Sequence, residues 1–184
     1  MQCRIVLLAM LGVWLVQARM ATAQDCPNCG NPLAQPQFSQ STTLADGWRL
    51  VKSRNPSGGG EIVSVMHAVD TAKSDVGLAG MSLRCGAIGP EVILILLDPV
   101  QTTGRLPVTL KTGSIKTQFE ASVLQDGRAI LLPLAATAVS NAAKRGTTEI
   151  SITVDTQPQT INGIVPLTGL LSALNSLSVH CSGK

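Results

Sequence analysis

The sequence has few aromatic residues, little net charge and no long hydrophobic run. Aromatic side chains make up 2% of its 184 residues, and tyrosine is absent. Proteins that bind single-stranded nucleic acids stack bases on aromatic side chains and need a basic surface. A formal net charge of +3 provides no such surface. We therefore expect no nucleic-acid partner, and a core built from Val, Ile, Leu and Ala.

The main apolar run lies near the N-terminus and is too short to cross a membrane. It extends from Ile5 to Val16, whereas a spanning helix needs about 20 apolar residues. Arg4 precedes the run, and Ala21-Thr22-Ala23 has the small-x-small pattern of a cleavage site. We interpret residues 1–23 as a signal peptide and expect a mature chain that begins at Gln24. The protein is then periplasmic or secreted, without stable membrane insertion.

The mature chain divides by composition into a cysteine-containing arm, residues 24–47, and one β-rich domain, residues 48–184. The arm contains three prolines and a polar run to Thr43 without a hydrophobic period, which is typical of a flexible segment. From Trp48 onward, short apolar segments alternate with turns. This second region has the length of a single domain.

Alternating segments predict a mainly β domain. Met81, Leu83 and Cys85 share one face of a strand, and the apolar run 92–97 is interpreted as a strand covered on both faces. Residues 116–123 alternate most clearly, and the Asp-Gly pair after them favours a tight turn that folds 129–132 back. The prediction is an antiparallel β-sandwich or barrel-like sheet of roughly seven to nine strands.

Two segments have helical spacing instead. Apolar residues recur at i, i+3, i+4 and i+7 from Ala135 to Ala142, and Gly146 is the expected stop. Leucines from Leu167 to Leu177 form a second helical stripe, with Thr168 as the expected N-cap. The sheet should therefore carry one or two short helices.

The cysteines are the most informative side chains. The chain has five, and Cys3 leaves with the signal peptide, so an even number remains in an exported protein. We favour a disulfide between Cys85 and Cys181, which would fasten the last helix to the central strand. Closing a loop of ~100 residues stabilises a domain by up to about 4.7 kcal/mol in the entropic model.

The second pair, Cys26 and Cys29, has the spacing of a redox motif or of half a zinc site. A redox motif of this spacing opens a helix whose positive end lowers the thiol pKa, but Pro27, Gly30 and Pro32 argue against a helix here. Zinc needs two further ligands. A local disulfide is the favoured interpretation, and metal binding, redox exchange and intermolecular pairing stay open.

No arrangement of residues indicates a catalytic site. His67 lies inside an expected strand and His180 beside Cys181, so neither has the setting of a general base. Asp70, Lys73 and Asp75 share a polar loop, which we interpret as a solvated turn rather than a cation site. No catalytic, cofactor or metal residue is predicted.

The order of these elements resembles the VasI family of type VI secretion-associated proteins. The resemblance runs from Trp48 to Cys181 and rests on the Leu83-Arg84-Cys85 strand end, the apolar strand 92–97, the alternating strand around Phe119, and the C-terminal leucine helix. Members of that family are exported bacterial proteins without an established enzymatic activity. The resemblance therefore implies an accessory role at the cell envelope, with protein partners there.

Two hypotheses follow from the sequence. The favoured one is a non-enzymatic envelope protein that works through exposed strands and loops. The alternative is a redox or metal-binding module that uses Cys26 and Cys29. Four oxidised cysteines without bound metal in the purified protein would favour the first hypothesis, and two titratable thiols or stoichiometric zinc the second.

Overall fold

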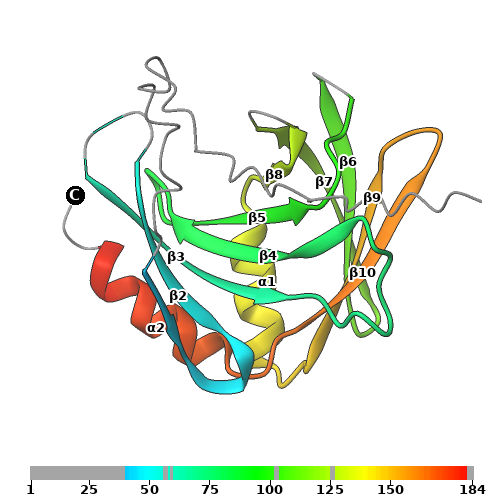
Figure 1. The fold of residues 1–184 in the computed structure, drawn as a ribbon. Coiled ribbons are helices and arrows are strands. Elements are labelled where there is room, and N and C mark those ends of the chain that lie inside the picture. Colours follow the sequence, from blue (N-terminus) through cyan, green and yellow to red (C-terminus); the bar gives the residue numbers. More distant parts are fainter. Residues whose placement is uncertain (1–39, 56–57, 59, 102–103, 125–126, 182–184) are drawn as a thin grey trace, which may run out of the picture. The chain divides into compact units, whose positions relative to one another are not determined.

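Segments with a two-residue hydrophobic period form one antiparallel sheet of ten strands in this computed structural model, which describes residues 40–55, 58, 60–101, 104–124 and 127–181 (Figure 1). The strand order is β1-β2-β3-β4-β5-β8-β7-β6-β9-β10. The strands are β1 (Gln40–Thr43), β2 (Arg49–Arg54), β3 (Glu61–Ala68), β4 (Leu78–Cys85), β5 (Pro90–Leu96), β6 (Arg105–Thr112), β7 (Ile115–Val123), β8 (Ala129–Leu132), β9 (Glu149–Asp155) and β10 (Thr160–Pro166).

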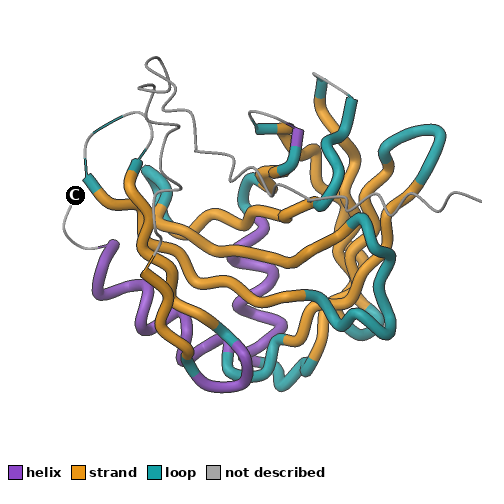
Figure 2. The backbone as a smooth tube through the Cα atoms, viewed as in Figure 1, coloured by secondary structure: helices purple, strands orange, loops and turns teal. Residues whose placement is uncertain are grey.

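Two α-helices lie against one side of this sheet, as Figure 2 shows. They are α1 (Ala135–Lys144) and α2 (Leu170–Cys181), and a short 3-10 helix, η1 (Ala45–Gly47), joins β1 to β2. The predicted mainly β, antiparallel fold with two short helices is confirmed. The hairpin expected around the Asp-Gly pair is also present, since Ser122 of β7 lies opposite Leu131 of β8.

The structure contains two strands that the sequence does not predict. β1 has the polar sequence QSTT and is exposed along its whole length, so it shows no hydrophobic alternation. It pairs with β2, and the described sheet therefore begins at Gln40, within the range assigned to the arm. β10 contains an Asn-Gly pair and ends at Pro166, which are signals of a turn.

The hydrophobic core lies between the sheet and the two helices. Alternate residues of β5 are buried in this core, namely Val92, Leu94 and Leu96. Ile93, which points the other way, is only 8% exposed, but Leu97 is half exposed, so the cover expected on both faces stops before the end of that run. The helices contribute their own buried stripes, Ala135, Val139 and Ala142 from α1 and Leu170, Ala173 and Leu177 from α2.

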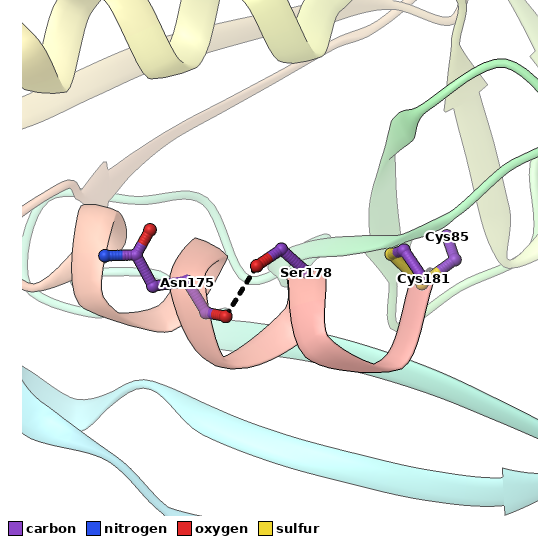
Figure 3. Close-up of a disulfide and its surroundings, with 4 residues drawn as sticks. All are labelled: Cys85, Asn175, Ser178 and Cys181. Carbon is purple, nitrogen blue, oxygen red and sulfur yellow. Dashed lines mark hydrogen bonds between the residues drawn. A yellow bond between two sulfur atoms is a disulfide. The ribbon is translucent and has the colours of Figure 1, made fainter. Parts of the chain in front are cut away.

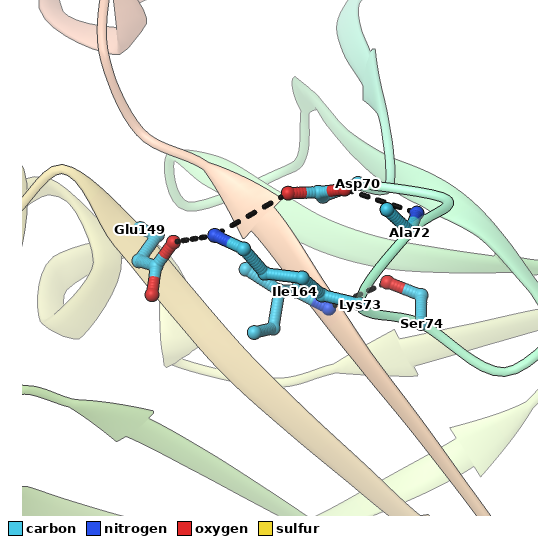
Figure 4. Close-up of polar contacts among 6 residues, drawn as sticks. All are labelled: Asp70, Ala72, Lys73, Ser74, Glu149 and Ile164. Atoms are coloured by element: carbon cyan, nitrogen blue, oxygen red, sulfur yellow. Dashed lines mark hydrogen bonds and ion pairs between the residues drawn. The ribbon is translucent and has the colours of Figure 1, made fainter.

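The loop between β3 and β4 covers the outer edge of β10. The backbone N–H groups of Asp70 and Asp75 donate to the carbonyls of Ile164 and Asn162, both at 2.8 Å. In return, the N–H of Asn162 donates to the Asp75 carboxylate at 2.7 Å. The N–H of Ile164 donates to the Ser74 hydroxyl at 2.9 Å (Figure 4). A free sheet edge invites pairing with another chain, and this loop prevents it at β10.

Candidate binding groove

The two helices approach each other at one end and separate at the other. The N–H of Leu167, just before α2, donates to the carbonyl of Thr148, just after α1, at 2.8 Å. Away from this bond, α1 leads back to β8, whereas α2 ends at Cys181 beside β4. The space between the helices, closed at one side by the β4–β5 turn, is a cavity of about 770 Å³ that we call the helix groove.

The volume of the helix groove lies within the range of ligand pockets, ≈ 300–1,000 Å³. Its sides come from facing stripes of the two helices, and its rim from the β4–β5 turn and the residues between β8 and α1. The described residues that line it are Ile88, Gly89, Pro90, Glu91, Leu131, Pro133, Leu134, Ala136, Thr137, Ser140, Lys144, Leu171, Leu174, Asn175, Leu177, Ser178 and Cys181.

Large apolar side chains are exposed at the rim of the helix groove. Ile88 is 89% exposed, Leu134 77% and Leu171 38%, although they come from three separate parts of the chain. Single exposed apolar residues are normal on protein surfaces, but a group of them around a concave site indicates an interaction surface.

Only two charged residues line the described part of the helix groove, and only one of them has a partner of opposite charge. The Glu91 carboxylate accepts a hydrogen bond from Arg84 Nε at 3.0 Å, so its charge is compensated. Lys144, in the last turn of α1, is exposed and has no acidic partner among the described residues. The groove therefore presents an apolar surface with an uncompensated positive charge.

A disulfide fixes the end of α2 to the sheet. Cys85 at the end of β4 and Cys181 at the end of α2 are bonded, with 5.4 Å between their Cα atoms (Figure 3). This is the pair expected from the sequence. Within the same final turns of α2, the Ser178 hydroxyl donates to the Asn175 carbonyl at 2.8 Å. The side of the groove formed by α2 is thus tied covalently to the hairpin that forms its rim.

Trp48 fixes the start of α2. Its indole Nε1–H donates to the carbonyl of Thr168 at 2.9 Å, and the side chain is fully buried. The sequence predicts Thr168 as the N-cap, but α2 instead begins at Leu170, because Gly169 turns the chain with φ +77°. A Cβ on Gly169 would lie 2.7 Å from the Asp46 carboxylate, so this approach requires glycine.

His67 has a structural position, and His180 lies on the surface. His67 has Nδ1 2.6 Å from the carbonyl oxygen of Ala68 and Nε2 2.9 Å from that of Asp46, so whichever nitrogen carries the proton donates to the backbone. Its ring also lies edge-on to Trp48, with 5.2 Å between the ring centroids. His67 therefore supports η1 and Trp48. His180 is exposed in the last turn of α2.

The polar loop at Asp70 is structural. Lys73 Nζ lies 3.2 Å from Glu149 and 3.4 Å from Asp70, and these carboxylates, Glu149 first, raise the pKa of Lys73 (Figure 4). Asp75 instead holds β10, so the two aspartates do not converge on a common point. Within the described residues, no group of His, Cys, Asp or Glu side chains has the arrangement of a metal site.

Cys26 and Cys29 lie outside the described residues, so the choice among their four interpretations stays a prediction. The residues of the helix groove, in contrast, are described, but apart from Cys181, a predicted disulfide partner, the sequence assigns them no functional role. The leucine stripe of α2 and the helical spacing of α1 are readable in the sequence. The sequence does not show that the two helices contact each other. That contact depends on the Leu167–Thr148 hydrogen bond, which joins segments that the strands β9 and β10 separate.

Comparison with known proteins shows a likeness of fold. No protein-family model matches the sequence, and no curated protein matches it. The crystal structure of invasion associated protein B from Bartonella henselae is similar, with a TM-score of 0.51 and 17% sequence identity, over 78% of this chain and 97% of that one. At this identity, the likeness concerns the fold alone. Among the described residues, no helix has both the length and the apolar character needed to span a membrane.

Proposed function

We propose that this chain is an exported, non-enzymatic protein of the bacterial cell envelope that binds an apolar segment of another protein in the helix groove. The observation that carries the proposal is the exposure of Ile88, Leu134 and Leu171 around one concave site. Such residues lose contact with water when a partner covers them, which favours association. The signal-peptide pattern of residues 1–23 and the Cys85–Cys181 disulfide support export, because disulfides persist in oxidising compartments.

The construction of the groove also supports binding. Both ends of α2 are held by contacts with distant parts of the chain, so this side of the groove is already formed before a partner arrives. A preformed site costs less conformational entropy on association than one that must be ordered. The resemblance to the VasI family adds a narrower proposal, that the partner is a component of a secretion apparatus at the envelope.

The proposal can be tested by site-specific crosslinking in the cells that export the protein. A photoreactive phenylalanine derivative replaces Asn175, which lines the groove and is exposed, or Gln118, which is exposed on β7 away from it. We expect a crosslinked protein product in the periplasmic fraction from position 175, and none from position 118.

A second variant makes the result specific. Thr137→Trp fills the groove from α1, where Thr137 is exposed, and we expect it to abolish the crosslink at position 175. Crosslinks from position 118 alone, or a product at 175 that persists when the groove is filled, would contradict the proposal. Retention of the protein in the cytoplasm would contradict export.

A further inference from the structure

We infer that the helix groove selects a peptide segment that carries a carboxylate among its apolar residues, and that Lys144 is the residue that selects it. This inference rests on the proposed function and adds the chemistry of the partner. Its basis is the juxtaposition of an apolar cavity, an uncompensated cation on its wall, and two polar side chains, Thr137 on α1 and Asn175 on α2, that make no hydrogen bond within the described residues.

The charge of the groove favours an acidic group. Glu91, the other charged residue that lines it, is already paired with Arg84 at 3.0 Å. An acidic group on the partner would therefore contact Lys144 without competition from Glu91. A basic group on the partner would meet an uncompensated positive charge, which disfavours it. Charge complementarity of this kind sets the specificity of an interface more than its overall affinity.

The polar side chains of the groove favour a peptide over an acyl chain. Thr137 on α1 and Asn175 on α2 line opposite sides, and neither side chain makes a hydrogen bond within the described residues. The hydroxyl of Ser140 donates to the carbonyl of Thr137 at 3.1 Å, so the Ser140 hydroxyl oxygen can still accept a hydrogen bond. A peptide backbone offers N–H and C=O groups to such side chains, whereas a hydrocarbon tail would leave them unpaired.

Replacing Lys144 also changes the stability of α1, and the test must separate this effect from the effect on binding. A lysine in the last turn of a helix also interacts favourably with the helix dipole, so its replacement affects α1 as well. Arg145 provides a matched control, because it is the next residue, carries the same charge and is exposed, yet does not line the groove.

The experiment is selection of random peptides displayed on phage against the purified mature protein. The wild type, Lys144→Glu, Arg145→Glu and Thr137→Trp are used in parallel, after thermal unfolding has shown that each variant is folded. We expect the wild type and Arg145→Glu to enrich apolar peptides that contain Asp or Glu. Lys144→Glu should weaken binding of such a peptide by about tenfold or more, and should enrich peptides with Lys or Arg instead.

The outcomes separate the two proposals. Peptides that depend on an open groove but show no acidic preference, or that bind Lys144→Glu equally well, overturn the role of Lys144 and leave the proposed function standing. Peptides that bind Thr137→Trp as well as the wild type contradict the groove as the binding site. If no peptide is enriched and dodecanoate binds in a manner that depends on Lys144, the occupant is an acidic lipid and the peptide inference is wrong.

Discussion

The two helices that form the groove are held in different ways. α2 is fixed at its start by the Trp48 indole, which reaches Thr168 across a sequence separation of 120, and at its end by a disulfide across 96 residues. α1 is held by its buried stripe of small side chains, Ala135, Val139 and Ala142, and by local backbone bonds around Gly146. Its start has no side-chain cap, since Leu134 occupies that position with φ 62°.

The difference shows which side of the groove can adjust. Helices of ten and twelve residues are marginal in water on their own, so both depend on tertiary contacts. α2 has two long-range attachments and acts as the fixed side. The buried side chains of α1 include two alanines, whereas those of α2 include two leucines, and within the described residues no disulfide joins α1 to the sheet, so we expect α1 to move when a partner binds.

Replacing Trp48 removes the support at the start of α2 and leaves a large cavity. We expect Trp48→Ala to lower the free energy of unfolding by about 3–5 kcal/mol. Trp48→Phe keeps most of the apolar volume but loses the bond to Thr168, and should cost less. Thermal and denaturant unfolding measure both. An effect of Trp48→Ala under 1 kcal/mol, on the order of a surface substitution, would show that this residue does not hold the helix.

Replacing Cys85 or Cys181 by Ser should cost ~2–5 kcal/mol, because the unfolded chain gains freedom and α2 loses the attachment at its end. The matched control is the Cys26/Cys29 double variant, which should cost much less, since closing a short loop restricts the unfolded chain less. The measurement is unfolding under non-reducing conditions. Equal losses in the control and in Cys181→Ser would indicate a different cysteine pairing.

Val139 tests α1 in the same way. Val139→Ala removes two methyl groups from a fully buried position, and we expect a loss of about 2 kcal/mol. Hydrogen exchange should then become faster in α1 but not in α2, because the attachments of α2 are intact. Thr137→Ala, on the exposed side of the same helix, serves as the control. Equal acceleration in both helices would mean that they open as one unit.

Replacing Gly146 should lower the free energy of unfolding by a smaller amount. Gly146 ends α1 with φ +80°, and an added Cβ would meet nothing within 4 Å, so only the backbone conformation opposes a side chain there. We expect Gly146→Ala to cost about 1 kcal/mol, and Gly146→Asn less, because Asn tolerates this conformation better. Equal stability of Gly146→Ala and the wild type in thermal unfolding would show that the end of α1 adopts another conformation.

Replacing Lys73 should have the smallest effect on stability. Glu149 and Asp70 raise its pKa, so their contribution to stability is present below the ordinary lysine pKa of 10.5 and is lost as the pH rises through the raised value. The ion pairs are exposed, and such pairs contribute little. Lys73→Met should therefore leave the unfolding midpoint at pH 7 unchanged. A clear loss at pH 7 that disappears as the pH rises through the raised pKa of Lys73 would show that the pairs matter.

The sequence predicts the local parts of this structure well. Alternation at 116–123 and helical spacing at 135–142 arise from burial of one face, so the pattern is written in consecutive residues. The sequence also predicts the Cys85–Cys181 disulfide, because the mature chain has few cysteines to pair. The sequence does not predict β1, because a polar edge strand buries no face. It does not predict β10, because hydrogen bonds from the β3–β4 loop compensate for the Asn-Gly pair and the proline of that strand.

The helix groove could not be predicted, since it depends on how distant elements meet. Ile88 is exposed in a turn, Leu134 lies between β8 and α1, and Leu171 is the exposed edge of a leucine stripe. In the sequence, each has an unremarkable local role. Their common location follows from the sheet order, which brings the end of β4 and the start of β5 next to β8 and under α2.

The most direct test of the account is a comparison of the amide NMR spectra of the mature protein with and without a peptide selected on the wild type. We predict chemical-shift changes concentrated in α1, in α2 and in the turn from Gly86 to Glu91, with larger changes in α1 than in α2. Filling the groove by Thr137→Trp should remove them. Changes concentrated on β6 and β7, with both helices unaffected, would contradict the helix groove as the binding site.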